Sequence, residues 1–330
     1  MLNIGVIGVG SMGQNHARIY SEIGNLIGLA DENKETCTGI AEKFKTNWYT
    51  DYKQFLKNPE LDAVSIATPS STHLEIGLAA IEAGKHILVE KPLALTIEDA
   101  QKIVDAAKAQ GLTLAVGHVE RYNPIIDVTK NVLENKQFGD LISISSRRVS
   151  SFPARIKDVG VIMDLGIHDI DVLRYLVAEK VINVFALAGA TGNSSGGKDM
   201  EDHASILLDF ESDISGFIEI NWLTPMKVRK VSLTCSKNFV VMDYMDQSLE
   251  ISSSSIMEYD ISNLFHLPQK YDIKMIQVKR EEPLKNELLD FMSAIESKSA
   301  PKITGDDAIE TLRIAKAAME SYKKKQKIEL

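Results

Sequence analysis

The segment "MDLGIHDIDVLRYL", residues 163–176, places one histidine among acidic side chains on a predicted helix. At about 100° per residue the helix has one narrow polar stripe, formed by Asp164, His168, Asp171 and Tyr175. Apolar residues fill most of the remaining circumference, so the helix is largely buried and its stripe faces either solvent or a cleft. An imidazole beside carboxylates suits proton transfer near neutral pH. A metal site is the rival interpretation, but no histidine or cysteine cluster at ligand spacing supports it, so we predict no metal.

A redox cofactor for this stripe is indicated by the turn "GVGSMG" near the start of the chain. Gly8, Gly10 and Gly13 have the G-x-G-x-x-G spacing, which alone could be an ordinary glycine-rich turn. Here it follows an apolar run and opens a helical pattern, as dinucleotide binding requires. Asp31 ends the second apolar run, and its carboxylate can accept both ribose hydroxyls of NAD but would repel the 2′-phosphate of NADP. The sequence therefore predicts NAD as the cofactor.

Two further strand ends should reach the cofactor, since ligands of parallel sheets bind beyond the carboxyl ends of the strands. The first is "ATPSSTH", residues 67–73, where Ser70 or Ser71 could instead cap a helix. The second is "EKP", residues 90–92, in which the proline favours an extended Lys91 and makes the Lys91–Pro92 bond a candidate for the cis form. A lysine placed there could point into the cofactor crevice, although an ordinary surface lysine fits the same pattern.

The elements that must position these residues follow two patterns. Up to residue 119, near-continuous apolar strands ("LNIGVI", "NLIGLA", "AVSIA", "HILV", "TLAVG") alternate with helices over 11–22, 33–45, 71–83 and 96–109. This predicts an α/β Rossmann domain with a doubly wound parallel sheet over residues 1–119.

From residue 120 to 330 we predict an α+β domain with a large open, mainly antiparallel sheet, since apolar and polar residues alternate in most of its strands. Its predicted strands are "LISISSRRVSSF", "VINVFALAGAT", "HASILLDF", "ISGFIEINW", "VRKVSLTC" and "FVVMDYM". Residues 194–199 and 252–255 are predicted loops, and helices over 284–297 and 306–325 close the chain.

Bulk properties narrow the class of partner. A chain of 330 residues suits two domains, and a net charge of −9 argues against nucleic acid or an anionic membrane as a general partner. No stretch reaches membrane-spanning length, and the N-terminus has no secretory pattern. The two cysteines, Cys37 and Cys235, have no partner motif. We expect a cytoplasmic protein that binds a small molecule.

"GVIGVGSMGQNHA", "ATPSSTH", "VEKPLALTIEDA" and "DLGIH" together resemble the Gfo/Idh/MocA family of NAD(P)-dependent oxidoreductases, which act on sugars, cyclitols and sugar nucleotides. The resemblance covers essentially the whole chain. It implies that Lys91, Asp164 and His168 face the nicotinamide as catalytic residues. It also implies a homo-oligomer, a dimer or tetramer, in which the last helix of each chain packs back on the nucleotide domain. The predicted cofactor-binding residues are Gly8, Gly10, Ser11, Met12, Gly13, Asp31, Thr68, Pro69, Ser70, His73, Glu90 and Lys91.

A narrower likeness lies in "VGHVERYNP", residues 116–124, and in residues 152–176. Both resemble the subgroup that oxidises the 3-hydroxyl of UDP-N-acetylglucosamine, with Tyr122 in place of the usual phenylalanine. A basic cluster of Arg147, Arg148 and Arg155 could bind a substrate pyrophosphate, although ordinary charge on a strand face is the alternative. The predicted substrate-binding residues are Lys91, Arg121, Tyr122, Asn123, Arg155, Asp164 and His168.

The resulting hypothesis is an alcohol oxidation in which hydride leaves for the nicotinamide. His168 takes the hydroxyl proton, Lys91 stabilises developing alkoxide charge, and Asp164 orients the pair. Two alternatives remain open at this stage. The substrate could be a free inositol or aldose, or the chain could be a non-catalytic NAD-binding sensor.

Overall fold

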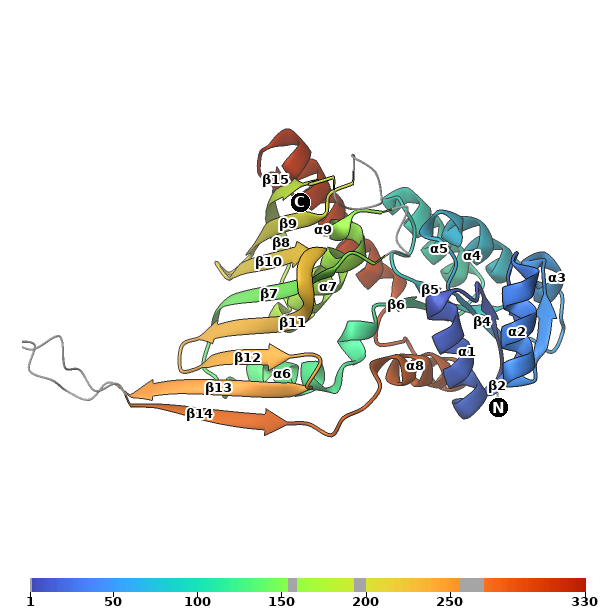
Figure 1. The fold of residues 1–330 in the computed structure, drawn as a ribbon, viewed down its shortest axis with the longest axis horizontal. Helices are drawn as coiled ribbons and strands as arrows, with labels where there is room; N and C mark the ends of the chain where they lie inside the picture. The colour runs from blue at the N-terminus through green and yellow to red at the C-terminus, as the bar shows by residue number, and fades with distance from the viewer. Residues whose placement is uncertain (1, 154–158, 193–199, 256–269) are drawn as a thin grey trace, which may run out of the picture. The chain divides into compact units, whose positions relative to one another are not determined.

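The computed structural model describes residues 2–153, 159–192, 200–255 and 270–330. Its internal contacts divide the chain into two compact units (Figure 1). The first unit contains residues 1–122 and 282–313, and the second contains residues 123–281 and 314–330. Arg155 and the predicted loop at 194–199 lie outside the described residues.

The first unit is built on a six-stranded sheet in which all neighbouring strands are parallel, in the order β3-β2-β1-β4-β5-β6. The order reverses direction beside β1, which is the switch point where such sheets bind dinucleotides. The predicted parallel sheet is thereby confirmed, and β3 is a short edge strand that the apolar pattern did not reveal. The strands are β1 (Asn3–Ile7), β2 (Asn25–Ala30), β3 (Asn47–Tyr49), β4 (Ala63–Ile66), β5 (His86–Glu90) and β6 (Leu114–Gly117).

The helices of the first unit begin and end close to the predicted positions. Asn33, Asp51 and Thr96 cap their helices through side-chain oxygens, which accept free N–H groups of the first turn. The short helix over 52–56 was not predicted. The helices are α1 (Ser11–Ile23), α2 (Lys34–Phe44), α3 (Tyr52–Leu56), α4 (His73–Glu82), α5 (Ile97–Ala109) and α8 (Pro283–Ser297), with 3₁₀ turns η1 (Ser70–Thr72) and η2 (Val119–Tyr122).

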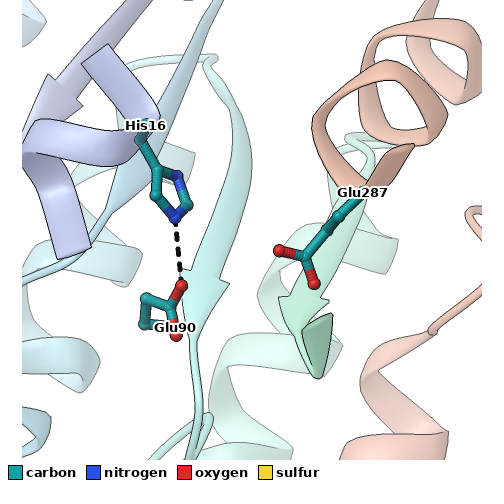
Figure 2. Close-up of side chains that lie close together, drawn as sticks. All are labelled: His16, Glu90 and Glu287. Carbon is teal, nitrogen blue, oxygen red and sulfur yellow. Dashed lines mark hydrogen bonds and ion pairs between the residues drawn. The ribbon is translucent and has the colours of Figure 1, made fainter. Parts of the chain in front are cut away.

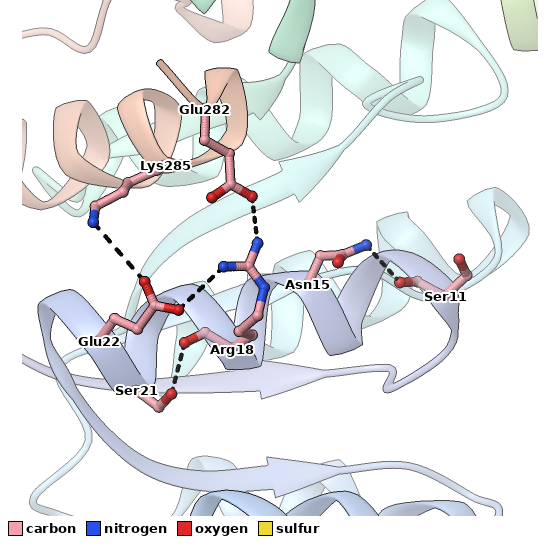
Figure 3. A network of polar contacts seen from close by, with 7 residues as sticks. All are labelled: Ser11, Asn15, Arg18, Ser21, Glu22, Glu282 and Lys285. Carbon is pink, nitrogen blue, oxygen red and sulfur yellow. Dashed lines mark hydrogen bonds and ion pairs between the residues drawn. The ribbon is translucent and has the colours of Figure 1, made fainter. Parts of the chain in front are cut away.

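Helix α8 belongs by its contacts to the first unit. The predicted boundary at residue 119 had placed this helix in the second domain. Its apolar face, including Leu288 and Phe291, joins the same buried cluster as Ile19 and Tyr20 of α1. Figure 3 shows the polar rim of this contact, where Arg18 of α1 bridges Glu22 and Glu282. The assignment of functions to the two domains, and the packing of the last helix on the nucleotide domain, stay predictions.

The second unit is built on a nine-stranded sheet in the order β14-β13-β12-β11-β7-β10-β9-β8-β15. Among the strands of this sheet that the structure describes, only β7 and β10 pair in parallel, so the prediction of a mainly antiparallel sheet is confirmed. The strands are β7 (Leu141–Ser151), β8 (Val181–Gly189), β9 (His203–Phe210), β10 (Ser215–Asn221), β11 (Leu223–Cys235), β12 (Phe239–Asp243), β13 (Ser248–Ser255), β14 (Lys270–Gln277) and β15 (Ile328–Glu329).

The predicted loop at 252–255 is wrong, because these serines continue β13. Ser252 pairs with Phe239 of β12 and with Ile273 of β14, and Ser253 pairs with Asp272. Strand pairing, with both neighbours at Ser252 and with β14 alone at 253–255, outweighs the turn preference of a serine run.

Three further helices lie wholly or partly in this unit: α6 (Pro124–Glu134), α7 (Ile167–Val177) and α9 (Gly305–Lys324). Helix α7 is preceded without a break by the π-turn η3 (Ile162–Gly166), in which the N–H of Ile167 reaches the carbonyl of Ile162. The sequence predicted a regular α-helix here, and the wider π-turn is a local correction. A Cβ on Gly166 would approach Ile220 to 2.9 Å, so the glycine lets the helix lie close against β10. None of the helices within the described ranges is long and apolar enough to cross a membrane.

Candidate functional site

The glycine turn between β1 and α1 has the geometry that its spacing predicted. Gly8 has φ +86°, a left-handed conformation that glycine adopts without strain. A Cβ on Gly13 would lie 1.8 Å from the carbonyl oxygen of Gly8, so this position must lack a side chain for helix and strand to meet. A Cβ on Gly10 would meet no atom within 4 Å, which leaves the open space a pyrophosphate needs beside the helix N-terminus. Ser11 and Met12 form the first turn of α1.

Asp31 follows β2 and lies against the glycine turn. Its Oδ2 accepts the backbone N–H of Val9 at 2.7 Å, and its Oδ1 accepts the N–H of Asn33 at 2.8 Å. The two bonds fix the carboxylate at the end of the strand, and each oxygen retains capacity for a further donor. The residues present therefore fit the adenosine ribose and pyrophosphate of NAD.

The loop after β4 is held by a buried histidine. His73 has no exposed surface, and its ring nitrogens lie 2.8 Å from the carbonyl oxygen of Pro92 and 3.0 Å from that of Thr68. Because carbonyls only accept, both bonds at once require the doubly protonated ring. No side chain caps η1 or α4, so the alternative role of Ser70 as a helix cap is not observed. His73 thus joins two predicted cofactor-binding segments through their backbones.

Lys91 is half-buried at the end of β5, and the Lys91–Pro92 bond is cis, as predicted. In the preceding residue, Glu90, the carboxylate lies 3.0 Å from Nε2 of His16 of α1 (Figure 2). It also accepts the backbone N–H of Lys91 at 3.3 Å. A Cβ on Gly117 would come within 2.9 Å of this carboxylate, so β6 leaves it room. Burial raises the pKa of Glu90, but the His16 hydrogen bond and the nearby positive charges outweigh burial and hold that pKa below its ordinary value. Glu90 therefore anchors the backbone that carries Lys91.

Glu287 of α8 faces the same buried pair (Figure 2). One ligand-type atom from each of His16, Glu90 and Glu287 lies within 4.8 Å of the others, and this is the one such group among the described residues. A zinc ion would need these atoms at about 2.0–2.2 Å from itself. The His16–Glu90 distance is that of a direct hydrogen bond, so we interpret the cluster as an anchor and assign it no metal.

Asp164 and His168 lie on the helix formed by η3 and α7 in the second unit. Asp164 is 3% exposed and His168 is half-buried, while Asp171 is buried and Tyr175 half-buried. The predicted stripe is thus mostly enclosed by protein, with its histidine and tyrosine partly accessible.

Arg148 does not belong to a substrate-binding cluster. Its Nε lies 2.6 Å from Oδ2 of Asp169 and its Nη2 lies 3.3 Å from Oδ1, and both residues are at most 2% exposed. Arg147 instead pairs with Glu219 at 3.2 Å on the exposed side of the sheet. The alternation of the strand sends these neighbours to opposite faces, so Arg147 and Arg148 do not share one basic surface, and Arg155 lies outside the described residues.

The three residues of "RYN" have buried contacts within their own units. Tyr122 donates its hydroxyl to Asp290 at 2.8 Å, and Arg121 lies 3.8 Å from Asp307. Asn123 caps α6 and donates its amide to the carbonyl of Tyr244 at 3.0 Å. Their assignment to substrate binding stays a prediction, beside the packing roles that the structure shows. Burial, followed by the charge of nearby acids, raises the pKa of Tyr122.

Comparison with known proteins places the whole chain in one family. Residues 2–118 match the family model of the Gfo/Idh/MocA oxidoreductases with an NAD-binding Rossmann fold, and residues 127–241 match the model of the Gfo/Idh/MocA C-terminal domain. The chain therefore belongs to the Gfo/Idh/MocA family. It is an NAD-dependent oxidoreductase that acts on CH–OH groups.

Two curated relatives are similar over almost their full lengths. The chain is 28% identical over 319 residues to the UDP-N-acetylglucosamine 3-dehydrogenase of Acidithiobacillus ferrooxidans, covering 97% of this chain and 96% of that protein. It is 26% identical to the myo-inositol 2-dehydrogenase of Thermotoga maritima, covering 100% of this chain and 98% of that protein.

Solved structures agree on the fold. The structure of the Acidithiobacillus ferrooxidans enzyme matches with a TM-score of 0.83 and 27% identity over 97% of both chains. A levoglucosan dehydrogenase in complex with NADH and levoglucosan matches with a TM-score of 0.86 over 99% of both chains. At 22% identity, this second likeness concerns the fold alone.

The sequence did not reveal three buried titratable residues that lie near the residues adjoining the predicted catalytic groups. His16, Asp169 and Glu287 are charged or titratable residues on otherwise apolar helix faces, and each is at most 1% exposed. For His16, the helical pattern alone offered an indication. This residue lies in the second turn of α1, on the helix face that packs on the sheet. Their partners come from distant segments, which a helical pattern does not identify.

Proposed function

We propose that this protein oxidises the 3-hydroxyl of UDP-N-acetylglucosamine to the 3-keto sugar with NAD. The observation that carries the proposal is the similarity to a UDP-N-acetylglucosamine 3-dehydrogenase over 97% of the chain, in sequence and in fold. The sequence likeness within residues 116–124 and 152–176 supports the same subgroup.

The chemistry assigns one task to each of three side chains. NAD supplies the hydride acceptor when it is bound. His168 accepts the proton of the substrate hydroxyl, because a half-buried imidazole can change charge near neutral pH. The ammonium of Lys91 donates to the same oxygen and stabilises its developing negative charge. Asp164, almost fully buried on the helix of His168, favours the protonated imidazole.

A second substrate class is favoured by a separate observation. The myo-inositol 2-dehydrogenase relative covers the chain equally well at nearly the same identity. In that case the same three side chains would act on a ring hydroxyl of a free cyclitol, and no residue would be needed for a nucleotide diphosphate.

The test is a melting-temperature screen with NAD and NADP, each crossed with UDP-N-acetylglucosamine, its uronate form and myo-inositol. A ligand at 100 times its dissociation constant adds about 2.7 kcal/mol to the free energy of unfolding. We expect a shift with NAD and UDP-N-acetylglucosamine, accompanied by NADH formation that His168→Gln and Lys91→Met each reduce at least about 100-fold. Turnover of myo-inositol without any shift from a UDP-sugar would replace the preferred substrate with the second class.

We further propose that the chain forms a homo-oligomer, a dimer or tetramer, in the cytoplasm. Leu207 of β9 and Phe217 of β10 are register partners and are 49% and 38% exposed, and Leu187 of β8 is 60% exposed. An apolar surface of this kind on one sheet face suits a second copy of the chain. Light scattering of the wild type and of Leu207→Asp tests this, since a charge there should produce monomers.

A further inference from the structure

A buried glutamate lies at the beginning of the helix that carries Asp164 and His168. Glu201 is 4% exposed, and its Oε1 accepts the backbone N–H of Ile162 at 3.2 Å. Its own carbonyl oxygen accepts the N–H of Val161 at 3.0 Å. One residue therefore satisfies two successive N–H groups that have no partner within the helix.

The chain opposite Glu201 is shaped to receive it. A Cβ on Gly160 would lie 2.2 Å from both Cδ and Oε1 of Glu201, a distance that no side chain tolerates. The carbonyl of Gly160 accepts the N–H of Asp164 at 3.0 Å, so the same glycine also begins the turn that contains Asp164. Gly160 and Glu201 thus form one contact, in which the missing side chain of the first makes room for the carboxylate of the second.

Glu201 is itself tied to the sheet. The next residue, Asp202, is fully buried, and its Oδ2 accepts the N–H and the hydroxyl of Thr191 at 2.8 and 2.6 Å. Its carbonyl accepts the N–H of Trp222 at 2.9 Å, just beyond the end of β10. The segment that holds the helix is therefore fixed at both Thr191 and Trp222. These contacts restrain movement of the helix relative to the sheet at the helix end that contains Asp164.

The charges around Glu201 come from Lys323 near the end of α9 and from the adjacent Asp202. Burial raises the pKa of Glu201, whereas hydrogen bonds from its own N–H and that of Ile162, and the charge of Lys323, lower it. Asp202 opposes ionisation, and the charge of Glu201 contributes, after burial, to a raised pKa of Tyr322. The carboxyl group accepts the Ile162 N–H in either ionisation state, so acceptance, rather than net charge, is the property to test.

We infer that Glu201 is a positioning residue for the reaction: through the Ile162 N–H and the space above Gly160, it fixes the helix that presents Asp164 and His168. The inference rests on the proposed function for its effect on catalysis. Within the described ranges, Glu201 accepts the backbone N–H groups of Val161 and Ile162 in the second unit, whereas the predicted NAD-binding turn belongs to the first unit. Its loss should therefore reduce turnover and leave NAD binding unchanged.

The test compares Glu201→Ala, Glu201→Gln and Gly160→Ala with Glu211→Gln, an exposed acid of the same unit. Misplacement of a catalytic group by about 1 Å costs up to about 100-fold, so we expect Glu201→Ala and Gly160→Ala to lower kcat about 10- to 100-fold. NAD affinity should stay within about twofold of wild type. Glu201→Gln should retain most of the turnover, because its amide oxygen still accepts the Ile162 N–H. Equal loss in Glu201→Gln and Glu201→Ala, or normal kcat in Glu201→Ala, would overturn the inference.

Deuterium uptake by residues 161–168 gives a second readout that needs no substrate. We expect Glu201→Ala to exchange these amides about tenfold faster or more, with Glu201→Gln and Glu211→Gln close to wild type. Unchanged uptake in Glu201→Ala would also contradict the inference. If the wild type oxidises no UDP-sugar and no inositol, the proposed function fails, while this measurement still decides the role of Glu201.

Discussion

Each of the two units carries a buried acid directly beside a residue that we predict to be catalytic. In the first unit Glu90 precedes Lys91 and is bound by His16. In the second unit Asp169 follows His168 and is bound by Arg148. A functional side chain is thus held through the backbone of its neighbour in the sequence.

The two pairs differ in the partner of the acid. His16 makes one hydrogen bond to Glu90, whereas the guanidinium of Arg148 makes two to Asp169 and keeps its charge at every working pH. Arg148 also lies with its Cζ 5.2 Å from the ring centroid of Tyr244. We conclude that the second pair is a permanent ionic contact and that the first, with one hydrogen bond, is the weaker contact.

The largest effect is expected from breaking the second pair. Arg148→Met leaves the Asp169 carboxylate buried without its ionic partner, which should lower the free energy of unfolding by about 3–5 kcal/mol. Urea unfolding measures the change. Arg148→Met combined with Asp169→Leu should recover most of it, because no buried charge remains. The matched control is Arg147→Met on the exposed side of the same strand, expected within about 0.5 kcal/mol of wild type. Equal effects at positions 147 and 148 would contradict the comparison.

The first pair should give a smaller loss. His16→Leu removes the hydrogen bond to Glu90 at similar volume, and a buried acceptor that loses a partner costs about 1–3 kcal/mol. Since Glu90 is adjacent to Lys91, we also expect a reduced kcat, which separates this variant from a purely structural one. A loss as large as that of Arg148→Met, measured by the same urea unfolding, would show that the two pairs do not differ as proposed.

The pH dependence should have opposite signs for the two buried glutamates, Glu90 and Glu201. The pKa of Glu90 is lowered in the folded state, so its stabilisation is present above the unfolded value of 4.5 and is lost as pH falls through the folded pKa. The pKa of Glu201 is raised, so its protonated form favours folding and stability falls as pH rises from 4.5 through the folded pKa. The measurement is the free energy of unfolding of Glu90→Gln and of Glu201→Gln, each subtracted from that of wild type, from below to above pH 4.5. Plotted against pH, the two differences should have opposite slopes. Parallel curves would contradict these assignments.

The fold of the first unit could be predicted from the sequence because its strands are apolar throughout and its turns have residues with strict backbone requirements. Gly8 and Gly13 are examples, since their neighbours forbid any side chain. The strands β13 and β14 could not be predicted equally well, because the serines of 252–255 are held by pairing with β14, and at Ser252 also with β12, rather than by preference.

The candidate site, too, contains residues that the sequence predicted and residues that it did not. Asp31 and Lys91 follow directly after strands, so local pattern marks them as candidates, and the glycines do the same for the dinucleotide turn. The role of Arg148 could not be decided from the sequence, because charge alone cannot tell a substrate-binding arginine from one that pairs with Asp169, 21 residues away in sequence. Glu201 gave no signal, since its partners Gly160 and Ile162 lie about 40 residues earlier and are recognised only in three dimensions.

The smallest effect is expected at the surface of α1, one turn of helix or less from the buried pair of His16. Arg18 contacts Glu22 and Glu282, but its side chain is 36% exposed, and Lys285 lies 3.9 Å from Glu22 at the same rim (Figure 3). Exposed ion pairs contribute about 0–1 kcal/mol and are screened by salt. Arg18→Met should therefore change the free energy of unfolding by less than about 1 kcal/mol, and added salt should shrink the difference further. The cost of His16→Leu should persist at high salt, because its hydrogen bond is shielded from the solvent ions. If both variants respond to salt alike, burial is not what distinguishes the anchor of Lys91 from the polar rim beside it.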